Sequence, residues 1–212
     1  MVAAYDDRLN LRWRTQLSST EPVVAIGVDR QGNTLVLFDA VNRSGLGKVG
    51  GIWIDHSGNA GAEFQAMEGI DAPYSLLLTP RVESGLFARA YDHAVAAWIR
   101  QFESMGEGSA PPDWLAARPG TKLHMARNGR AYAVIHPARA DGVCHADIEV
   151  IATSGKICGT AVFPADPLGD SCAGDLTVGY DGTVVEIVGN TFFNDGTANH
   201  NCNFRWWKGF LQ

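Results

Sequence analysis

Histidine and carboxylate side chains gather in the longer connections of this chain, and they are the residues best suited to acid–base chemistry. A histidine beside a carboxylate can move protons near neutral pH, and the same groups can bind a divalent metal ion. Solvated connections are also rich in such residues because Asn, Asp and Gly favour turns. The candidate catalytic residues are His136, His145, Asp195 and His200.

A second set of residues suits the binding of a ligand. Trp114 lies in a proline-rich connection, where an indole ring can stack on a sugar or on another apolar group. The most polar stretch is NDGTANHNC, at positions 194–202. The predicted binding residues are Trp114, Asp141, Asn194, Asp195 and His200.

Local signatures of nucleophiles, phosphate loops and zinc sites do not occur in the sequence. There is no GxSxG, SxxK, HExxH, Walker or CxxC pattern. The segments DRQGN and DHSGN resemble calcium loops only superficially, because they lack the alternating acidic ligands and the distal glutamate. We therefore predict no cofactor and no metal site, with a divalent metal in a connection as a minor alternative.

The elements that must hold these residues are short strands. Runs of β-branched and aromatic residues alternate with period two and are bounded by Gly, Asn or Asp, which predicts an all-β chain. Tight turns are expected where Gly supplies a positive φ beside a residue that can bond its own backbone. They fall at 29–33 (DRQGN), 55–59 (DHSGN), 128–129, 154–155 and 181–182.

Repetition is the strongest signal of architecture. The pattern Ala-Tyr-Asp followed by Trp and Gln occurs at 4–16 and again at 90–101, and pairs of hairpins recur about every fifty residues. Units of four antiparallel strands would open near Val23, Tyr74, Thr121 and Leu176. With these turns the chain resembles the β-propeller superfamily, although no WD dipeptide, kelch double glycine or Asp-box is intact.

The resemblance implies a single domain over 1–212, a β-propeller of about four to five antiparallel four-stranded blades. The N-terminal hairpin would pair with the C-terminal strand and close the ring, which removes exposed sheet edges. The tight turns would lie on one face, and the connections 104–120, 137–146, 164–174 and 190–202 would emerge on the other, around the channel mouth. A β-sandwich is the structural alternative.

Charge and hydropathy exclude some partners. The 212 residues carry a net charge of −6, so no basic face is expected and nucleic-acid binding is unsupported. No apolar run is long enough to span a bilayer, and the N-terminus lacks the features of a signal peptide.

The four cysteines lie in the last third of the chain, and their even number predicts disulfides and a secreted or periplasmic location. Cys172 and Cys202 would both start strands at the face that bears the connections, so we predict a bond between them. Cys144 and Cys158 would lie at opposite ends of one hairpin, too far apart for a bridge unless a strand bends. Their pairing is left open.

Three classes of function fit these features. The first is a binding module for a small molecule, a glycan, a peptide or another protein, acting through the connections or the central channel. The second is a hydrolase or lyase that uses histidine and carboxylate groups at the channel mouth, with or without a metal ion. The third is a fragment that completes its propeller by oligomerisation, so the chain would be a monomer or a homo-oligomer.

Overall fold

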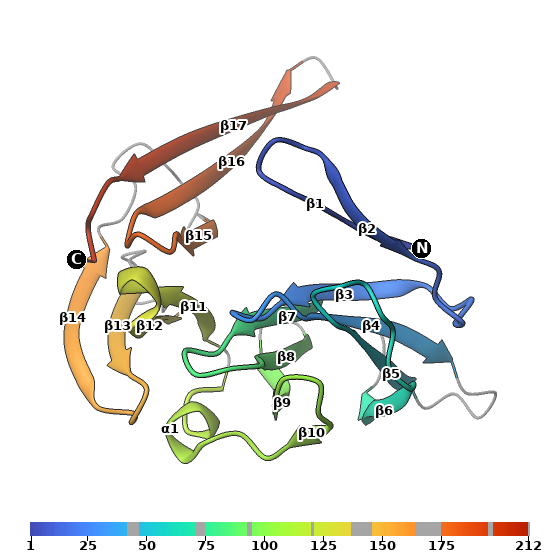
Figure 1. Ribbon diagram of the computed structural model, residues 1–212. Helices are drawn as coiled ribbons and strands as arrows, with labels where there is room; N and C mark the ends of the chain where they lie inside the picture. The colour runs from blue at the N-terminus through green and yellow to red at the C-terminus, as the bar shows by residue number, and fades with distance from the viewer. Residues whose placement is uncertain are drawn as a thin grey trace. The chain divides into compact units, whose positions relative to one another are not determined.

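The computed structural model describes residues 1–41, 47–70, 75–92, 95–119, 121–136, 146–163, 175–194 and 197–211. These residues form antiparallel sheets almost throughout (Figure 1). The chain divides into two compact units, Met1–Pro119 and Gly120–Gln212. The single domain expected over 1–212 stays a prediction. Within the described ranges, no helix combines the length and the apolar character that crossing a membrane requires.

The first unit contains three sheets. A two-stranded sheet pairs β1 (Val2–Tyr5) with β2 (Leu11–Thr15). The next sheet has the order β3-β4-β5-β6, with β3 (Val23–Val28), β4 (Thr34–Val41), β5 (Gly47–Ile54) and β6 (Phe64–Ile70). The third has the order β10-β9-β8-β7, with β7 (Ser75–Pro80), β8 (Leu86–Asp92), β9 (Val95–Phe102) and β10 (Gly108–Ser109), and the short helix α1 (Asp113–Ala116) follows it.

The second unit contains two sheets. One has the order β11-β12-β13-β14, with β11 (Lys122–Ala126), β12 (Ala131–His136), β13 (Ala146–Ala152) and β14 (Ile157–Phe163). A short 3₁₀ turn (Arg127–Gly129) joins β11 to β12. The other sheet has the order β15-β16-β17, with β15 (Asp175–Val178), β16 (Val184–Asn194) and β17 (Thr197–Trp207).

The prediction of an all-β chain with repeated four-stranded antiparallel sheets is confirmed. The expected hairpin units also match the sheets, including a last sheet of three strands. A closed ring is not shown, because β1 has its ladder with β2 and β17 has its ladder with β16. Pairing between the two chain ends therefore stays a prediction, and so does the propeller.

The five predicted tight turns are present, and each has a glycine with positive φ: Gly32, Gly58, Gly129, Gly155 and Gly182. In 29–33 and 55–59 the first residue's N–H donates to the fifth carbonyl, and the glycine N–H donates back to the first carbonyl. The Asp carboxylate also accepts two backbone N–H groups of its own turn. This geometry depends on residues close in sequence, so it is readable without tertiary information.

The central strands β4 and β5 of the β3–β6 sheet are buried on both faces. Leu35 and Leu37 of β4 belong to one apolar cluster, which also contains residues of the β7–β10 sheet such as Leu86 and Phe102. Val36 between them lies on the opposite face, in a second cluster that the N-terminal hairpin covers with Val2 and Trp13. Because successive side chains of a strand alternate between faces, a continuous apolar run places β4 between two layers.

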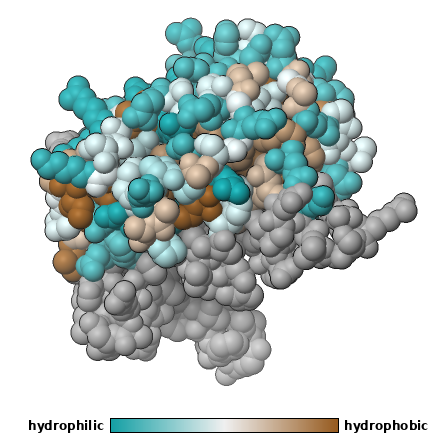
Figure 2. All heavy atoms as spheres, turned by 90° about the horizontal axis from the view of Figure 1, so that it is seen from below, coloured by the Kyte–Doolittle hydropathy of each residue, from teal (hydrophilic) through white to brown (hydrophobic). Residues whose placement is uncertain are grey.

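In the second unit, one face of the β11–β14 sheet packs against the β15–β17 sheet. Ala133, Ile135 and Val150 share a cluster with Leu176 and Val178 of β15. The surface outside these cores is mixed in character. The face in Figure 2 is largely hydrophilic and is broken by separate apolar patches.

Candidate functional site

The β11–β14 sheet has two different ends. In the β11–β14 sheet, the tight turns at 127–130 and 152–156 lie at one end, which we call the turn end. The antiparallel strand order places the last residues of β12 and β14 and the first residue of β13 at the other end, which we call the connection end. The same alternation holds within the β3–β6 sheet. The described strand ends agree with the predicted sorting in these two sheets, and the sorting over the whole chain stays a prediction.

His136 and Glu149 form a pair at the connection end of the β11–β14 sheet. His136 is the last residue of β12 and lies opposite Asp147, so Glu149, two residues further along β13, shares its face of the sheet. Nε2 of His136 lies 3.2 Å from Oε2 of Glu149. Nε2 makes no aligned hydrogen bond, so the contact becomes an ion pair only when the imidazole is protonated.

The pair has a surface position that a ligand can approach. The side chains of His136 and Glu149 are 35% and 20% exposed. Thr160 of β14 lies opposite Glu149 and adds an exposed hydroxyl to the same face. A carboxylate beside an imidazole can hold the ring in one orientation and stabilise its protonated form, which is useful in proton transfer and in hydrogen bonding to a polar ligand.

Trp114 is in α1 and packs on its own unit. Its ring meets Phe87 of β8 edge to face, with centroids 6.0 Å apart and planes at 87°. Its carbonyl accepts a hydrogen bond of 2.6 Å from Nη1 of Arg118. Trp114 is only half-buried, so part of the indole remains accessible, and its contact with a ligand stays a prediction.

The prediction of an irregular connection at 190–202 is wrong. β16 and β17 pair continuously from Val184 with Trp207 to Asn194 with Thr197, so this segment forms a long hairpin. Asn194 ends β16, and His200 lies within β17 opposite Thr191. Five of the eleven residue pairs of this ladder lie within 190–202, and their backbone pairing outweighs the turn preference of the Asn, Asp and Gly residues. The sites proposed at Asn194 and His200 are thus on strands.

The segment 104–120 also differs from expectation, because it begins at the turn end of its sheet. β9 runs toward that end and finishes at Phe102, so Ser104 lies among the tight turns. Only the later part of this segment, through β10 and α1, leads away from the turn end.

The described residues test only part of the cysteine prediction. Cys158 is a free, exposed thiol, and the described residues contain no disulfide. Cys202 lies in the middle of β17 opposite Gly189, so the premise that it starts a strand was wrong. Cys172 lies outside the described residues, and the predicted bond stays a prediction. The other candidates outside the described ranges are Asp141, His145 and Asp195.

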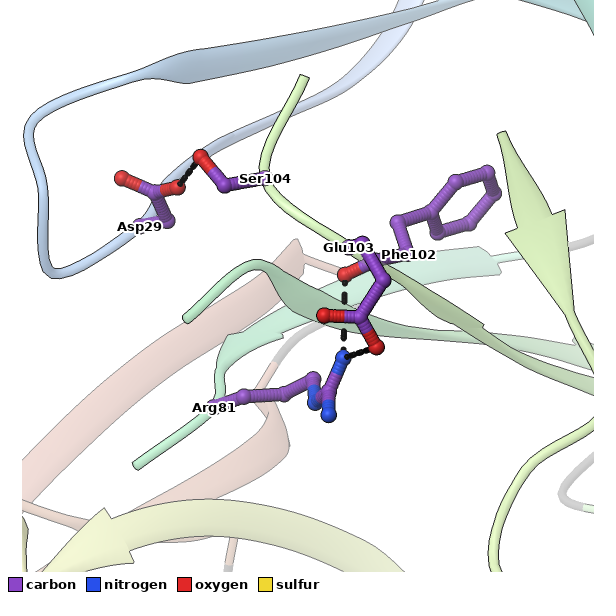
Figure 3. A network of polar contacts seen from close by, with 5 residues as sticks. All are labelled: Asp29, Arg81, Phe102, Glu103 and Ser104. Atoms are coloured by element: carbon purple, nitrogen blue, oxygen red, sulfur yellow. Dashed lines mark hydrogen bonds and ion pairs between the residues drawn. The ribbon is translucent and has the colours of Figure 1, made fainter. Parts of the chain in front are cut away.

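In the first unit, a polar network that the sequence did not predict joins the turn after β3 to the segment after β9 (Figure 3). Oδ1 of Asp29 accepts the N–H groups of Gln31 and Asn33, and Oδ2 accepts the hydroxyl of Ser104 at 2.5 Å. The side-chain amide of Asn33 donates to the same hydroxyl at 2.7 Å. Ser104 follows β9, so this network ties the turn of one sheet to the turn of the next.

A second link in Figure 3 lies beside it. Nη1 of Arg81 meets Oε1 of Glu103 at 2.5 Å and the carbonyl of Phe102 at 3.4 Å. The Arg81 guanidinium also lies over the Phe87 ring, 5.6 Å from its centroid. Arg81 is mostly buried, whereas the Glu103 side chain is 58% exposed. The turn end is therefore a rigid, internally bonded surface.

Asp29→Ala is expected to cost about 3 kcal/mol of unfolding free energy, because it leaves two backbone donors and the Ser104 hydroxyl without their buried acceptor. Asp55→Ala is the matched control. Asp55 bonds the same five-residue turn but is far more exposed than Asp29, which is 5% exposed. Urea denaturation measures both, and equal losses would refute a cross-sheet role for Asp29.

Arg89 was not singled out by the sequence either. It lies in β8 among apolar neighbours, is 1% exposed, and donates from Nη2 to the carbonyl of Arg118 at 2.9 Å. This bond anchors the segment that follows α1. The sequence did contain a signal for this anchor, which is the single arginine in the apolar run LFARAYD. An arginine in a buried strand must find a hydrogen-bond acceptor.

No cluster of three or more His, Cys, Asp or Glu side chains that could hold a metal ion occurs in the described part of the chain. No protein-family model matches the chain, and no curated protein sequence matches it. Its function has to be inferred from its own geometry.

Proposed function

We propose that the chain is a recognition module that binds a glycan, a peptide or a protein through the connection ends of its sheets. The observation that carries this proposal is the difference between the two ends. The turn ends are closed by short hydrogen-bonded turns such as 29–33 and 152–156. The opposite end of the β11–β14 sheet presents the polar side chains of His136 and Glu149, and His136 immediately precedes the segment 137–145 in the sequence. Binding residues commonly lie on connections that a rigid scaffold positions.

We infer that the sheets are arranged as in a propeller, and one contact within each unit supports this inference. In the first unit, β3 and β7 are the first strands of successive sheets, and they approach closely. A Cβ placed on Gly27 of β3 would lie only 2.7 Å from Cβ of Leu78 of β7. In the second unit, the turn after β11 meets the turn after β15, where the N–H of Asn128 donates to the carbonyl of Tyr180 at 2.8 Å. Propeller blades pack with their first strands side by side around an axis.

The chemistry of the ligand follows from the groups available. The His136 imidazole, the Glu149 carboxylate and the Thr160 hydroxyl offer donors and acceptors on one sheet face. Such a set suits hydroxyl and amide groups, as found in sugars and peptides. The net charge of −6 disfavours polyanions as ligands.

A glycan array and a displayed peptide library test the proposal. We expect a ligand whose affinity falls at least roughly tenfold, the loss of about one good polar contact, when 137–145 is replaced by a Gly-Ser segment of equal length. The control replaces exposed residues at the turn end, Ser57→Ala with His56→Gln, and should bind normally. Binding that survives replacement of the connection, or no ligand on either library, would overturn the proposal.

The His136–Glu149 contact favours hydrolase or lyase activity as a second candidate. A panel of chromogenic esters, phosphoesters and glycosides separates enzymatic activity from recognition alone. Turnover by the parent chain that is lost in both His136→Gln and Glu149→Gln would replace the recognition function with an enzymatic one. The imidazole and the carboxylate lie 3.2 Å apart, so the carboxylate can stabilise a protonated imidazole, and each variant keeps polarity and size.

A further inference from the structure

β14 is the last strand of its sheet, and among the described residues no strand lies beside its outer edge. The strand order is β11-β12-β13-β14, and the ladder of β14 is with β13 (Figure 1). In an antiparallel pair, every second residue of a terminal strand directs its N–H and carbonyl groups away from the neighbouring strand. The outer edge of β14 therefore offers a row of main-chain donors and acceptors.

The sequence of β14 lacks the features that protect an edge strand. Natural edges are blunted by a charged side chain, a proline, a bulge or a very short strand. The outer strand β6 contains Glu68 and has two irregularities in its ladder, and β10 has only two residues. β14 has the sequence ICGTAVF and pairs in regular register with β13 from Gly159 to Phe163. It is an uncharged, regularly paired edge, which can accept another strand.

The side chains of β14 are exposed on both faces of the strand. Ile157 and Val162 are 46% and 64% exposed, and Cys158 and Thr160 between them are also exposed. A Cβ placed on Gly159 would meet no atom within 4 Å. Because side chains alternate between the two faces, a strand added at this edge would cover Ile157 on one face and Val162 on the other. Burial of apolar surface would thus accompany the pairing of the main chains.

Two carboxylates beside this edge indicate the chemistry of its occupant. Thr160 lies opposite Glu149, and Val162 lies opposite Asp147, so both carboxylates share the sheet face of Thr160 and Val162. Asp147 is exposed, and the side chain of Glu149 is 20% exposed. A strand added at the edge would lie two strand spacings from β13, about 10 Å, a distance that a lysine or arginine and the Glu149 side chain can bridge together. The edge therefore favours a strand with a basic side chain on this face.

We propose that β14 binds an extended peptide of a partner protein as an additional strand, with a lysine or arginine of the peptide directed over Thr160 toward Glu149 and Asp147. This inference rests on the recognition function proposed above and narrows its ligand to a peptide. The main chain of the peptide pairs with the outer edge of β14, which gives affinity for many sequences. The basic side chain gives selectivity, because alternate residues of the peptide lie on the face that carries the carboxylates.

A displayed library of random peptides, followed by an N-methyl scan of a selected peptide, tests this mode of binding. We expect the selected peptides to contain a lysine or arginine between β-branched residues. N-methylation should weaken binding roughly tenfold at every second residue, where it removes a donor to β14. It should have much less effect at the residues between, whose N–H groups point away from β14. A peptide bound through its side chains alone would not show this alternation.

Substitutions on β14 and β13 make the test specific to this edge. Val162→Lys places a positive charge on the edge strand and should weaken binding of the selected peptide at least roughly tenfold. The matched control Val162→Thr should retain binding, because threonine is β-branched and uncharged. Glu149→Gln should keep the alternation of the N-methyl scan but reduce the preference for lysine or arginine. Melting temperatures show whether each variant is folded.

Other outcomes would overturn the proposal. An N-methyl scan that lowers affinity evenly along the peptide, or equal losses in Val162→Lys and Val162→Thr, would exclude strand addition at β14. A glycan ligand without any selected peptide would refute this inference and leave the recognition function in place, whereas no ligand of either kind would refute both. A parent chain at twice 22.8 kDa that returns to 22.8 kDa in Val162→Lys would identify a second copy as the occupant.

Discussion

Gly85→Ala is expected to destabilise the chain by about 4 kcal/mol or more, which is a large fraction of the stability of an ordinary domain. Gly85 has φ of +76°, a conformation that alanine adopts only with strain. A Cβ at this position would also lie 1.9 Å from the carbonyl oxygen of Phe102. That oxygen belongs to the backbone at the end of β9, so a side-chain rotation cannot relieve the clash. Urea denaturation or the melting temperature measures the loss.

Gly159→Ala is the matched control for this prediction. Gly159 has no positive φ, and a Cβ there would meet no atom within 4 Å. We expect its stability to remain near that of the parent chain, within about 0.5 kcal/mol. A small loss at Gly85, close to that of Gly159, would mean that β8 and β9 approach less closely than described.

Acidification from pH 7 to pH 4 is expected to remove about 3 kcal/mol of stability through His124 alone. Burial lowers the pKa of His124 to about 4, and the nearby charge of Lys122 lowers it further. His124 lies opposite Ala133 of β12, and its Nε2 is shielded from solvent without a hydrogen-bond partner. The unfolded chain has an ordinary histidine pKa of 6.5. The folded state therefore binds fewer protons between these values, and stability is full above pH 6.5 and falls toward pH 4.

The groups around His124 do not offset this effect. Lys122 shares its strand and its face of the sheet, and the apolar residues Leu176 and Val178 lie on the neighbouring strand β15. Asp6, Asp55 and Asp181 have pKa values lowered by hydrogen bonds, so their contribution is present above 3.8 and is lost only at more acidic pH. Most of that loss falls below pH 4, so these carboxylates add little to the change in stability between pH 6.5 and 4.

His124→Leu should remove the loss between pH 6.5 and 4 and should stabilise the chain at pH 7, because it replaces an unpartnered buried imidazole by an apolar group. His56→Gln, on the exposed turn 55–59, is the control and should retain the loss. Denaturation midpoints measured across this pH range decide the matter. A parent chain as stable at pH 4 as at pH 7 would show that the His124 imidazole is solvated.

The local elements of this fold were predictable because their causes are local. The turns at 29–33 and 55–59 each combine an Asp acceptor with a glycine of positive φ within five residues. Strands with period two followed from the same reading. The similar turn at 6–10 (DDRLN) was missed because leucine stands at the position where glycine is the usual signal. The polar hairpin of β16 and β17 was misread as a connection because its composition favours turns, although its two segments pair along their whole length.

By itself, the sequence determined the all-β class, the hairpins and their turns, since hydrogen bonds between near neighbours and the alternation of side chains leave a readable pattern. Only the tertiary structure decided which of two residues at the same turn position forms a hydrogen bond to another sheet. Asp29 and Asp55 occupy the same position in the same turn, yet Asp29 is buried against Ser104 and Asp55 holds only its own turn. The pairing of His136 with Glu149 likewise needed the register of β12 on β13. Burial and register are set by which sheets meet, and residue spacing along one chain does not record this.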